Sequence, residues 1–248
     1  MRKITAGIFF SVFFSCILKN AGSFAQITGG NSYKPNWYIN KEAKNPADIF
    51  DSLHLGKLGL GRVIFDYAML GYRNFKAKGM LGKNDILSII DFSQPSSKKR
   101  LYVVDMKNCR LLFHTYAAHG RNSGTVNTLY FSNEPESFKS SVGFYLTADT
   151  YTGKHGYSLR LKGYEAGFND KAEERDIVMH SADYVNEALI KQQGYIGRSL
   201  GCPALAPEIY KAVIQKIQNK SCLFMYGNSG QYIENSKMLK QKMNLNNP

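Results

Sequence analysis

The segment GRSLGCPAL, residues 197–205, carries the strongest chemical signal in the chain. Cys202 follows Gly201 and precedes Pro203, so the backbone can turn sharply at the thiol and direct amide groups toward one point. Such amides could stabilise the oxyanion that forms when a thiolate attacks a carbonyl carbon. The apolar periodicity that follows predicts a helix over residues 207–217, which would place Cys202 just ahead of a helix N-terminus and favour its thiolate.

A nucleophilic thiol needs a base, and His180 is the natural candidate. It ends the apolar run at residues 177–179, so we expect it at the end of a strand that faces a cleft. A histidine that precedes the cysteine argues against papain-like peptidases, in which the cysteine comes first. Taken singly, each residue has another explanation, because Cys202 could be a small buried apolar residue and His180 a structural histidine.

A second set of candidates surrounds a long polar stretch at residues 119–141, which exceeds an ordinary connection and is a candidate active-site loop. His119 opens this stretch and could bind substrate or cap the preceding strand. Arg121 and Arg198 could bind a substrate carboxylate or remain solvated surface charges. The sequence contains no His-Glu-x-x-His, no paired-cysteine spacing, no Gly-x-Ser-x-Gly and no phosphate loop, so we expect no metal or nucleotide site.

The elements that must position these residues are mainly short strands. Runs rich in β-branched and aromatic residues predict strands at 86–92, 101–106, 110–118, 143–147, 158–162, 177–180 and 222–226. Two helices are predicted between Pro46 and Lys78, the second ending near Gly79. The predicted fold is therefore mainly β with flanking helices, preceded by a short helical extension.

Five segments follow from these patterns along the 248 residues. We expect a signal peptide at 1–25, a polar linker at 26–45, the helical extension at 46–84, the β domain at 85–226 and a polar, frayed tail at 227–248.

The first segment combines the basic residues Arg2 and Lys3, an apolar run at 8–18 and small residues at the ends of Ser23-Phe24-Ala25. This is the pattern of a cleaved secretory signal, and the run is short for a bilayer span. Export to the periplasm or cell envelope is therefore expected. Cys16 also allows a lipoprotein, although Phe13-Phe14-Ser15 is a poor lipobox.

The formal net charge of +13 arises from 32 Lys and Arg against 19 Asp and Glu. This balance suits a polyanion such as nucleic acid, anionic lipid or an anionic cell wall. The basic residues are mostly scattered, and no basic helix interleaved with aromatic residues is evident, so nucleic acid is not the expected partner.

Cleavage of the signal peptide would leave three cysteines, Cys109, Cys202 and Cys222. An odd number leaves at least one thiol without an internal disulfide. A bridge between Cys109 and Cys222 is one possibility, and a buried apolar Cys222 is the other.

The sequence resembles the L,D-transpeptidase catalytic domain (YkuD-like), in the branch of murein L,D-transpeptidase catalytic domain proteins. That family carries a histidine and, after a gap, Ser/Thr-His-Gly-Cys, matched here by His180 and by Ser199-Leu200-Gly201-Cys202. The resemblance covers about residues 85–226, and its other matching positions are 99–105, 119–121, 131–133, 141–144, 163, 169–170 and 175. Leu200 replaces the second histidine, which leaves His180 as the base, and Pro203-Ala204 replaces the usual apolar-then-polar pair.

The resemblance implies a β-sandwich or barrel of the L,D-transpeptidase type and a reaction without a cofactor. Cys202 would attack the carbonyl of the L-centre of diaminopimelate in a murein tetrapeptide stem and expel the terminal D-Ala. His180 would be the base, oriented by the backbone carbonyl of Ser181, and the amides of Gly201 and Cys202 would hold the oxyanion. Ser199, Arg198, His119 and Arg121 would contact substrate.

The implied partners are peptidoglycan stem peptides, with an acceptor amine from another stem or from a wall-linked protein. Transfer to the amine would cross-link two stems, and transfer to water would be carboxypeptidase activity. The resemblance also implies carbapenems as acylating inhibitors. Two other hypotheses remain open: a catalytically inert secreted domain that binds murein, and a murein cysteine endopeptidase.

Overall fold

The computed structural model describes residues 46–240 of the chain. The predicted signal peptide, the linker and Cys16 lie outside the described residues, as do residues 241–248. Within the described part of the chain, no helix combines the length and the apolar character needed to cross a membrane.

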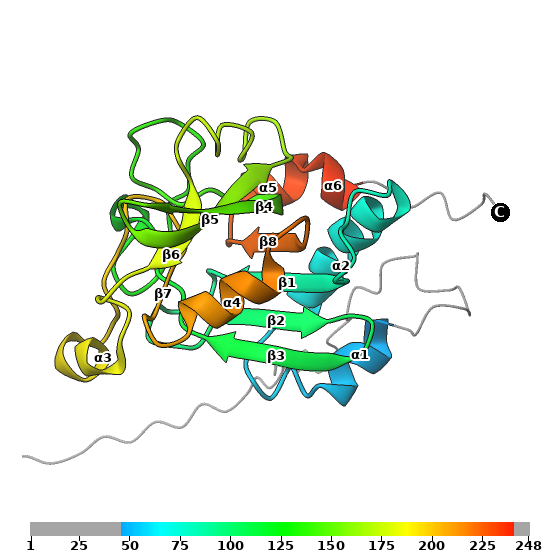
Figure 1. Ribbon diagram of the computed structural model, residues 1–248, viewed down its shortest axis with the longest axis horizontal. Coiled ribbons are helices and arrows are strands. Elements are labelled where there is room, and N and C mark those ends of the chain that lie inside the picture. Colours follow the sequence, from blue (N-terminus) through cyan, green and yellow to red (C-terminus); the bar gives the residue numbers. More distant parts are fainter. Residues whose placement is uncertain (1–45, 241–248) are drawn as a thin grey trace, which may run out of the picture. The chain divides into compact units, whose positions relative to one another are not determined.

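The centre of the fold is an eight-stranded sheet with the order β3-β2-β1-β8-β4-β5-β6-β7 (Figure 1). Its strands are β1 (Ile86–Asp91), β2 (Leu101–Asp105), β3 (Arg110–Thr115), β4 (Gly143–Gly153), β5 (Gly156–Gly163), β6 (Val178–Ser181), β7 (Ala204–Leu205) and β8 (Cys222–Tyr226). The pairs β1–β8 and β6–β7 are parallel, and the other pairs are antiparallel. A bridge from Ala118, just after β3, to Ala204 of β7 brings the two edges together, so the sheet is nearly closed.

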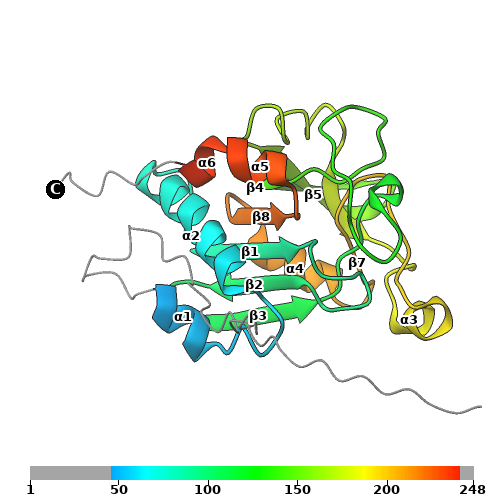
Figure 2. The ribbon, with the colours of Figure 1, turned by 180° about the vertical axis from the view of Figure 1, so that it is seen from behind.

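Both faces of the central strands are buried, which explains their nearly continuous apolar sequences. Leu87 and Ile89 of β1 belong to one core cluster, whereas Ile86 and Ile90 belong to the other, as the two-residue period of a strand requires. Helix α2 (Arg62–Ala77) covers the first face and α4 (Tyr210–Ile217) the second (Figures 1 and 2).

The predicted helices of the extension are present as α1 (Pro46–Ser52) and α2. Helix α2 lies so close to the sheet that a Cβ atom at Gly71 would come within 2.1 Å of the Phe144 ring. Phe75, one helical turn further on, meets the same ring edge-on with centroids 6.4 Å apart. Only glycine permits this approach, and the helix therefore packs as part of the β domain's core.

The mainly β fold and all seven predicted strands are confirmed. The sequence missed β7, which has only two residues, and α3 (Glu187–Gln193), which has no buried side chain and hence no clear apolar face. The helix predicted over 207–217 begins only at Tyr210, because residues 207–209 form a turn.

The expected frayed tail is wrong for residues 230–240, which form the short helices α5 (Gly230–Asn235) and α6 (Lys237–Lys240). The Tyr232 side chain is completely buried, and its hydroxyl donates a 2.8 Å hydrogen bond to the buried carboxylate of Glu165. Ser236 bonds to the same carboxylate. These anchors are single residues within a polar segment, so the sequence pattern did not reveal them.

The possible bridge between Cys109 and Cys222 is not formed. Cys222 is a free, fully buried cysteine of β8, held between Leu87 of β1 and Leu146 of β4. No disulfide joins it to Cys109, which lies in the turn between β2 and β3. Cys222 is therefore the buried apolar residue of the second alternative.

Candidate active site

Cys202 lies in the turn that leads into β7, against the start of β6. Its half-buried sulfur accepts a hydrogen bond from the Val178 N–H and donates to the Asp176 carbonyl, each at 3.5 Å. Strands β6 and β7 pair in parallel with His180 opposite Ala204, and the His180 N–H donates to the Pro203 carbonyl, so the backbones that carry the imidazole and the thiol run side by side at one edge of the sheet. Cys202 and His180 are 22 residues apart in sequence, and the short pairing of β6 with β7 brings their segments together.

Ser199 holds the turn that carries the thiol. Its hydroxyl donates to the Cys202 carbonyl at 2.6 Å and accepts from the Gly201 N–H at 3.1 Å. Gly201 has a φ of +128°, and a Cβ there would lie 2.9 Å from the Lys139 carbonyl oxygen, so a larger residue would distort the turn.

The same contacts revise two expected roles. The Gly201 N–H is already bonded to the Ser199 hydroxyl, so it is not free to hold an oxyanion in this structure, and of the two expected amides that of Cys202 is left for the role. Ser199 is buried and its hydroxyl bonds within the turn, so its role in this structure is to shape the site.

The imidazole of His180 has a defined tautomer. Its Nδ1 lies 2.8 Å from the Ser181 carbonyl oxygen, the contact that the family resemblance implies. A carbonyl can only accept, so Nδ1 carries the proton and Nε2 keeps a free lone pair. Burial lowers the pKa of His180, and the neighbouring His155 lowers it further, which favours the neutral form that can act as a base.

The thiol is not ionised in advance by its surroundings, contrary to the expectation from the sequence. Burial raises the pKa of Cys202, although the Val178 N–H and the charge of Arg175 act in the opposite direction. The residues after Cys202 form β7, and α4 begins eight residues later (210 − 202), so no helix N-terminus stabilises the thiolate. A base must therefore take the proton during the reaction.

Arg175 holds the long loop at residues 119–141, and its charge acts on the Cys202 thiol. Its guanidinium donates to the carbonyls of Ser132 and Lys139, both at 2.7 Å, and also bonds to the Ser141 hydroxyl. These donors satisfy loop groups that are 34–43 residues away in sequence. The candidate active-site loop is thus ordered by a residue adjacent to β6.

His119 is completely buried, so the prediction that it contacts substrate is wrong. Its Nδ1 lies 2.7 Å from Arg100 Nη2, and its Nε2 lies 3.2 Å from the Gly124 carbonyl. Burial and the adjacent Arg100 charge lower the pKa of His119 to about 3. Arg100 is itself fully buried and donates to the carbonyls of Gln94 and Ala117, so this pair organises the base of the loop.

The two other arginines also contact the loop. Arg198 Nη1 donates to the carbonyls of Arg121 and Gly124 at 3.4 and 3.3 Å. The Arg121 guanidinium lies 4.3 Å from the centre of the Phe138 ring, a cation–π distance. Both therefore stabilise the loop, and exposed Arg121 also remains accessible to a substrate carboxylate.

A family model for the L,D-transpeptidase catalytic domain matches residues 57–226, which include the whole site and α2. The chain belongs to this family.

Solved structures of L,D-transpeptidases are similar at low identity. The enzyme from Mycobacterium smegmatis shares 13% identity over 58% of this chain and 59% of its own, with a TM-score of 0.36. The enzyme from Stackebrandtia nassauensis shares 17% over 68% and 69%, with a TM-score of 0.34. One from Mycobacterium tuberculosis H37Rv shares 13% over 57% of each chain, with a TM-score of 0.33. No curated protein gave a match.

Sequence reasoning missed a histidine beside the proposed base of this L,D-transpeptidase domain. The ring of His155, in the turn between β4 and β5, stacks on that of His180 with centroids 4.4 Å apart and an interplanar angle of 26°. The Gly153-Lys154-His155-Gly156 sequence signals a hairpin turn, but nothing local indicates which residue the turn will meet.

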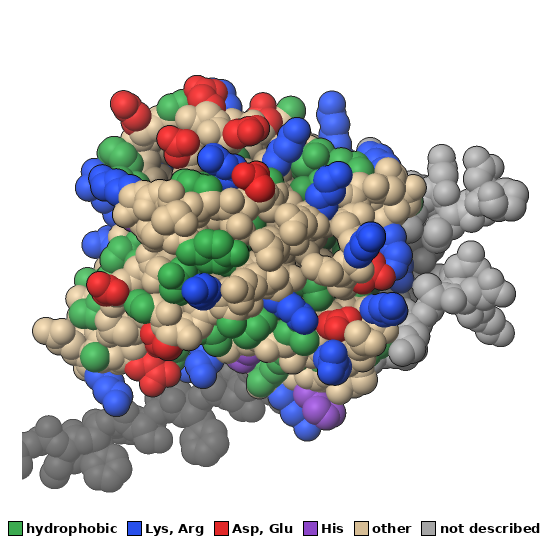
Figure 3. Space-filling view, in the orientation of Figure 1, with side chains coloured by type: hydrophobic (Ala, Val, Ile, Leu, Met, Phe, Trp, Pro, Cys, Tyr) green, Lys and Arg blue, Asp and Glu red, His purple; other side chains and the backbone are tan. Residues whose placement is uncertain are grey.

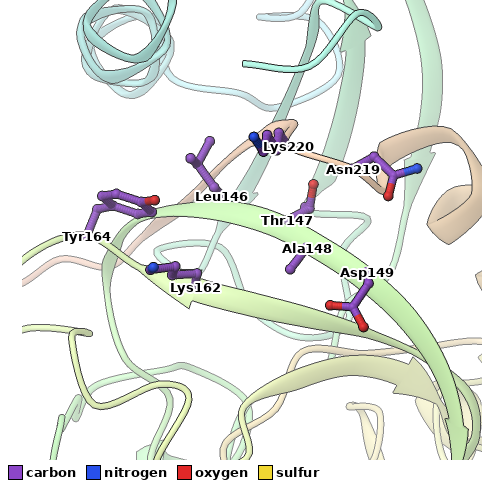
Figure 4. A pocket seen from close by; sticks show the side chains of 8 residues that line it. All are labelled: Leu146, Thr147, Ala148, Asp149, Lys162, Tyr164, Asn219 and Lys220. Carbon is purple, nitrogen blue, oxygen red and sulfur yellow. The ribbon is translucent and has the colours of Figure 1, made fainter. Parts of the chain in front are cut away.

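A pocket of about 500 Å³ in the L,D-transpeptidase domain lies away from Cys202 (Figure 4). Its walls are Leu146, Thr147, Ala148, Asp149, Lys162, Tyr164, Asn219 and Lys220. None of these is a candidate catalytic residue, so the pocket does not identify the reaction site. Among residues 46–240, no group of three His, Cys, Asp or Glu side chains is placed to hold a metal ion.

Lys and Arg side chains are distributed over the face seen in Figure 3, with Asp and Glu among them. This face shows no single basic patch of the kind that follows a nucleic-acid backbone.

Proposed function

We propose that the protein is an exported L,D-transpeptidase that forms a thioester between Cys202 and a murein stem peptide. The observation that carries this proposal is the pairing of β6 with β7, which brings a neutral His180 to the turn that holds Cys202. Membership of the L,D-transpeptidase family supplies the substrate class, since both proposed reacting side chains lie within the matched residues.

In the acylation step, the S–H bond turns from the Asp176 carbonyl toward His180 Nε2, which takes the proton. The sulfur attacks the carbonyl carbon of the L-centre of diaminopimelate, and a C–S bond forms as the carbonyl oxygen becomes an oxyanion. We assign the Cys202 N–H as the donor that stabilises that oxygen. Collapse of this intermediate breaks the C–N bond, and the proton on His180 passes to the departing amine of D-Ala.

In the second step, an acceptor attacks the thioester carbonyl. An amine of another stem gives a cross-link, water gives a trimmed stem, and in each case His180 accepts a proton and returns it to the sulfur. The Ser181 carbonyl stabilises the imidazolium in both steps because it accepts the Nδ1 proton.

The proposal includes the expected route to the substrate. Residues 1–25 would direct export, residues 26–45 would link the signal to the folded part, and the positive net charge would favour an anionic envelope. The exposed Arg121 is the proposed contact for a stem carboxylate.

The test is mass spectrometry of purified muropeptides after incubation with the protein. Cross-linked dimers with loss of D-Ala, or trimmed tripeptide stems, support the proposal when Cys202→Ala abolishes them. Cleavage within existing cross-links would indicate an endopeptidase. Binding of murein without any Cys202-dependent product would indicate an inert wall-binding domain.

A further inference from the structure

The proposed base has an aromatic neighbour that comes from a distant hairpin. His155 is exposed to solvent, whereas His180 is only 4% exposed. One face of the His180 ring is covered by the His155 ring, with centroids 4.4 Å apart. The other restraint on the imidazole is the 2.8 Å contact of Nδ1 with the Ser181 carbonyl.

The hairpin turn that carries His155 has a defined backbone. Strands β4 and β5 close at the pair Gly153–Gly156, which leaves Lys154 and His155 as the two turn residues. Gly156 has a φ of +72°, which L side chains adopt only with strain, so the sequence favours one turn geometry here. The His155 ring is therefore presented by a structured turn at the end of a two-stranded ribbon.

From this geometry we propose that His155 is a positioning residue, whose ring holds the His180 imidazole at the angle needed to take the Cys202 proton. The hydrogen bond at Nδ1 restrains only one atom of the His180 ring, so the ring can still rotate about that hydrogen bond. A stacked ring restricts this rotation and excludes water from one face. The inference rests on the proposed function, since it assigns a partner to the base of that reaction.

Stacking also affects the charge that His180 can carry. Two imidazolium rings at this separation repel each other, so a cationic His155 opposes protonation of His180. Besides His155 and His180, the ionisable side chains of β4, β5, β6 and their turn are Tyr145, Asp149, Tyr151, Lys154, Tyr157, Arg160 and Lys162. The segments beside these strands add Arg175, Asp176, Tyr184 and Cys202. Arg160 pairs with Asp149 at 3.5 Å, and Arg175 is bonded to the long loop. His155 is the ionisable side chain that stacks on the His180 ring.

The experiment compares two substitutions with different losses. His155→Ala removes the ring and its charge, whereas His155→Phe keeps a ring that can stack and removes only the charge. Lys154→Ala, at the exposed neighbouring position in the same turn, is the matched control. Acylation of Cys202 by a carbapenem is followed by intact mass across pH 5–9, and the titration of His180 is followed by NMR, with its signal identified from its loss in His180→Asn.

We expect His155→Ala to slow acylation about 10-fold at neutral pH, the size of one aromatic stacking contact converted to a rate. His155→Phe should stay within about 3-fold of the wild-type rate. Both should move the titration of His180 and the acid limb of the rate profile to higher pH, more for Ala than for Phe. Lys154→Ala should change the acylation rate by no more than about 2-fold and should leave the titration of His180 in place.

Two outcomes overturn the inference in different ways. If Cys202 is acylated and His180 is required, but His155→Ala matches the wild type in rate and in the His180 titration, only the positioning role is lost. If the wild type is not acylated at Cys202 and makes no muropeptide product, the proposed function fails and the positioning role fails with it.

Discussion

The Ser199 hydroxyl donates to the carbonyl of Cys202, three residues further along, at 2.6 Å, while it accepts the N–H of Gly201. One side chain thus closes the turn that presents the thiol. Without this hydroxyl, the Cys202 carbonyl and the Gly201 N–H would each need another hydrogen-bond partner.

Ser199→Ala should therefore destabilise the protein by about 1–3 kcal/mol, the cost of leaving a buried polar group unsatisfied, and should slow acylation of Cys202. Ser199→Thr keeps the hydroxyl and should retain most of both properties. Urea unfolding gives the free energy, and carbapenem acylation gives the rate. An Ala variant with wild-type stability and rate would show that the turn holds its shape without this hydroxyl.

His180→Ala should slow thioester formation by roughly 100- to 10,000-fold, the usual contribution of a positioned general base. The circular dichroism spectrum should be unchanged, because the loss is chemical. A folded His180→Ala protein that acylates at the native rate would place the base elsewhere. His119 cannot substitute for it, since that ring is buried and bonded to Arg100.

A carbapenem should acylate the protein once, on Cys202, because its strained β-lactam carbonyl is attacked in the same way as a stem peptide. Intact mass should show one adduct, and peptide mapping should locate it. Cys202→Ala should abolish the adduct, whereas Cys222→Ala should not, since burial raises the pKa of the Cys222 thiol and excludes reagents. An unmodified wild type that still trims stems would mean that the site accepts stem peptides and excludes the drug.

Stability should fall with acidification between pH 6 and 4, in part because of His119. Its folded-state pKa of about 3 lies below the ordinary value of 6.5, so the unfolded chain binds a proton in this range and the folded chain does not. This difference lowers the unfolding free energy by about 1.4 kcal/mol per pH unit. Urea unfolding at pH 7, 6, 5 and 4 should show a smaller slope for His119→Gln, and equal slopes would assign the acid sensitivity to other groups.

The C-terminal helices should be part of the cooperative fold. Tyr232→Phe removes the hydrogen bond to Glu165 and should cost about 1–3 kcal/mol because the carboxylate is buried, whereas Tyr232→Ala should cost about 3–5 kcal/mol. Gln231→Ala, at the exposed neighbouring position, is the control and should stay within about 0.5 kcal/mol. Thermal and urea unfolding measure these changes, and an unaffected Tyr232→Ala variant would mean that the helices fray independently.

The sequence was sufficient to predict the features that depend only on neighbouring residues. Strands such as β1 and β8 are nearly continuous apolar runs because both faces of the sheet are covered, and such runs can be recognised without a structure. The Gly201-Cys202-Pro203 turn and the histidine at the end of an apolar run likewise identify a thiol and its candidate base, because residue type determines which groups can react.

The tertiary structure alone decided which polar residues are buried and with which partners. His119 and Arg121 stand two residues apart, yet His119 is fully buried against Arg100 and Arg121 is exposed. Glu165 and Tyr232 meet across 67 residues, and His155 in the turn between β4 and β5 meets His180 in β6. The sequence of neither segment predicts which partner it will meet, because side-chain burial depends on how the strands and loops pack together in three dimensions.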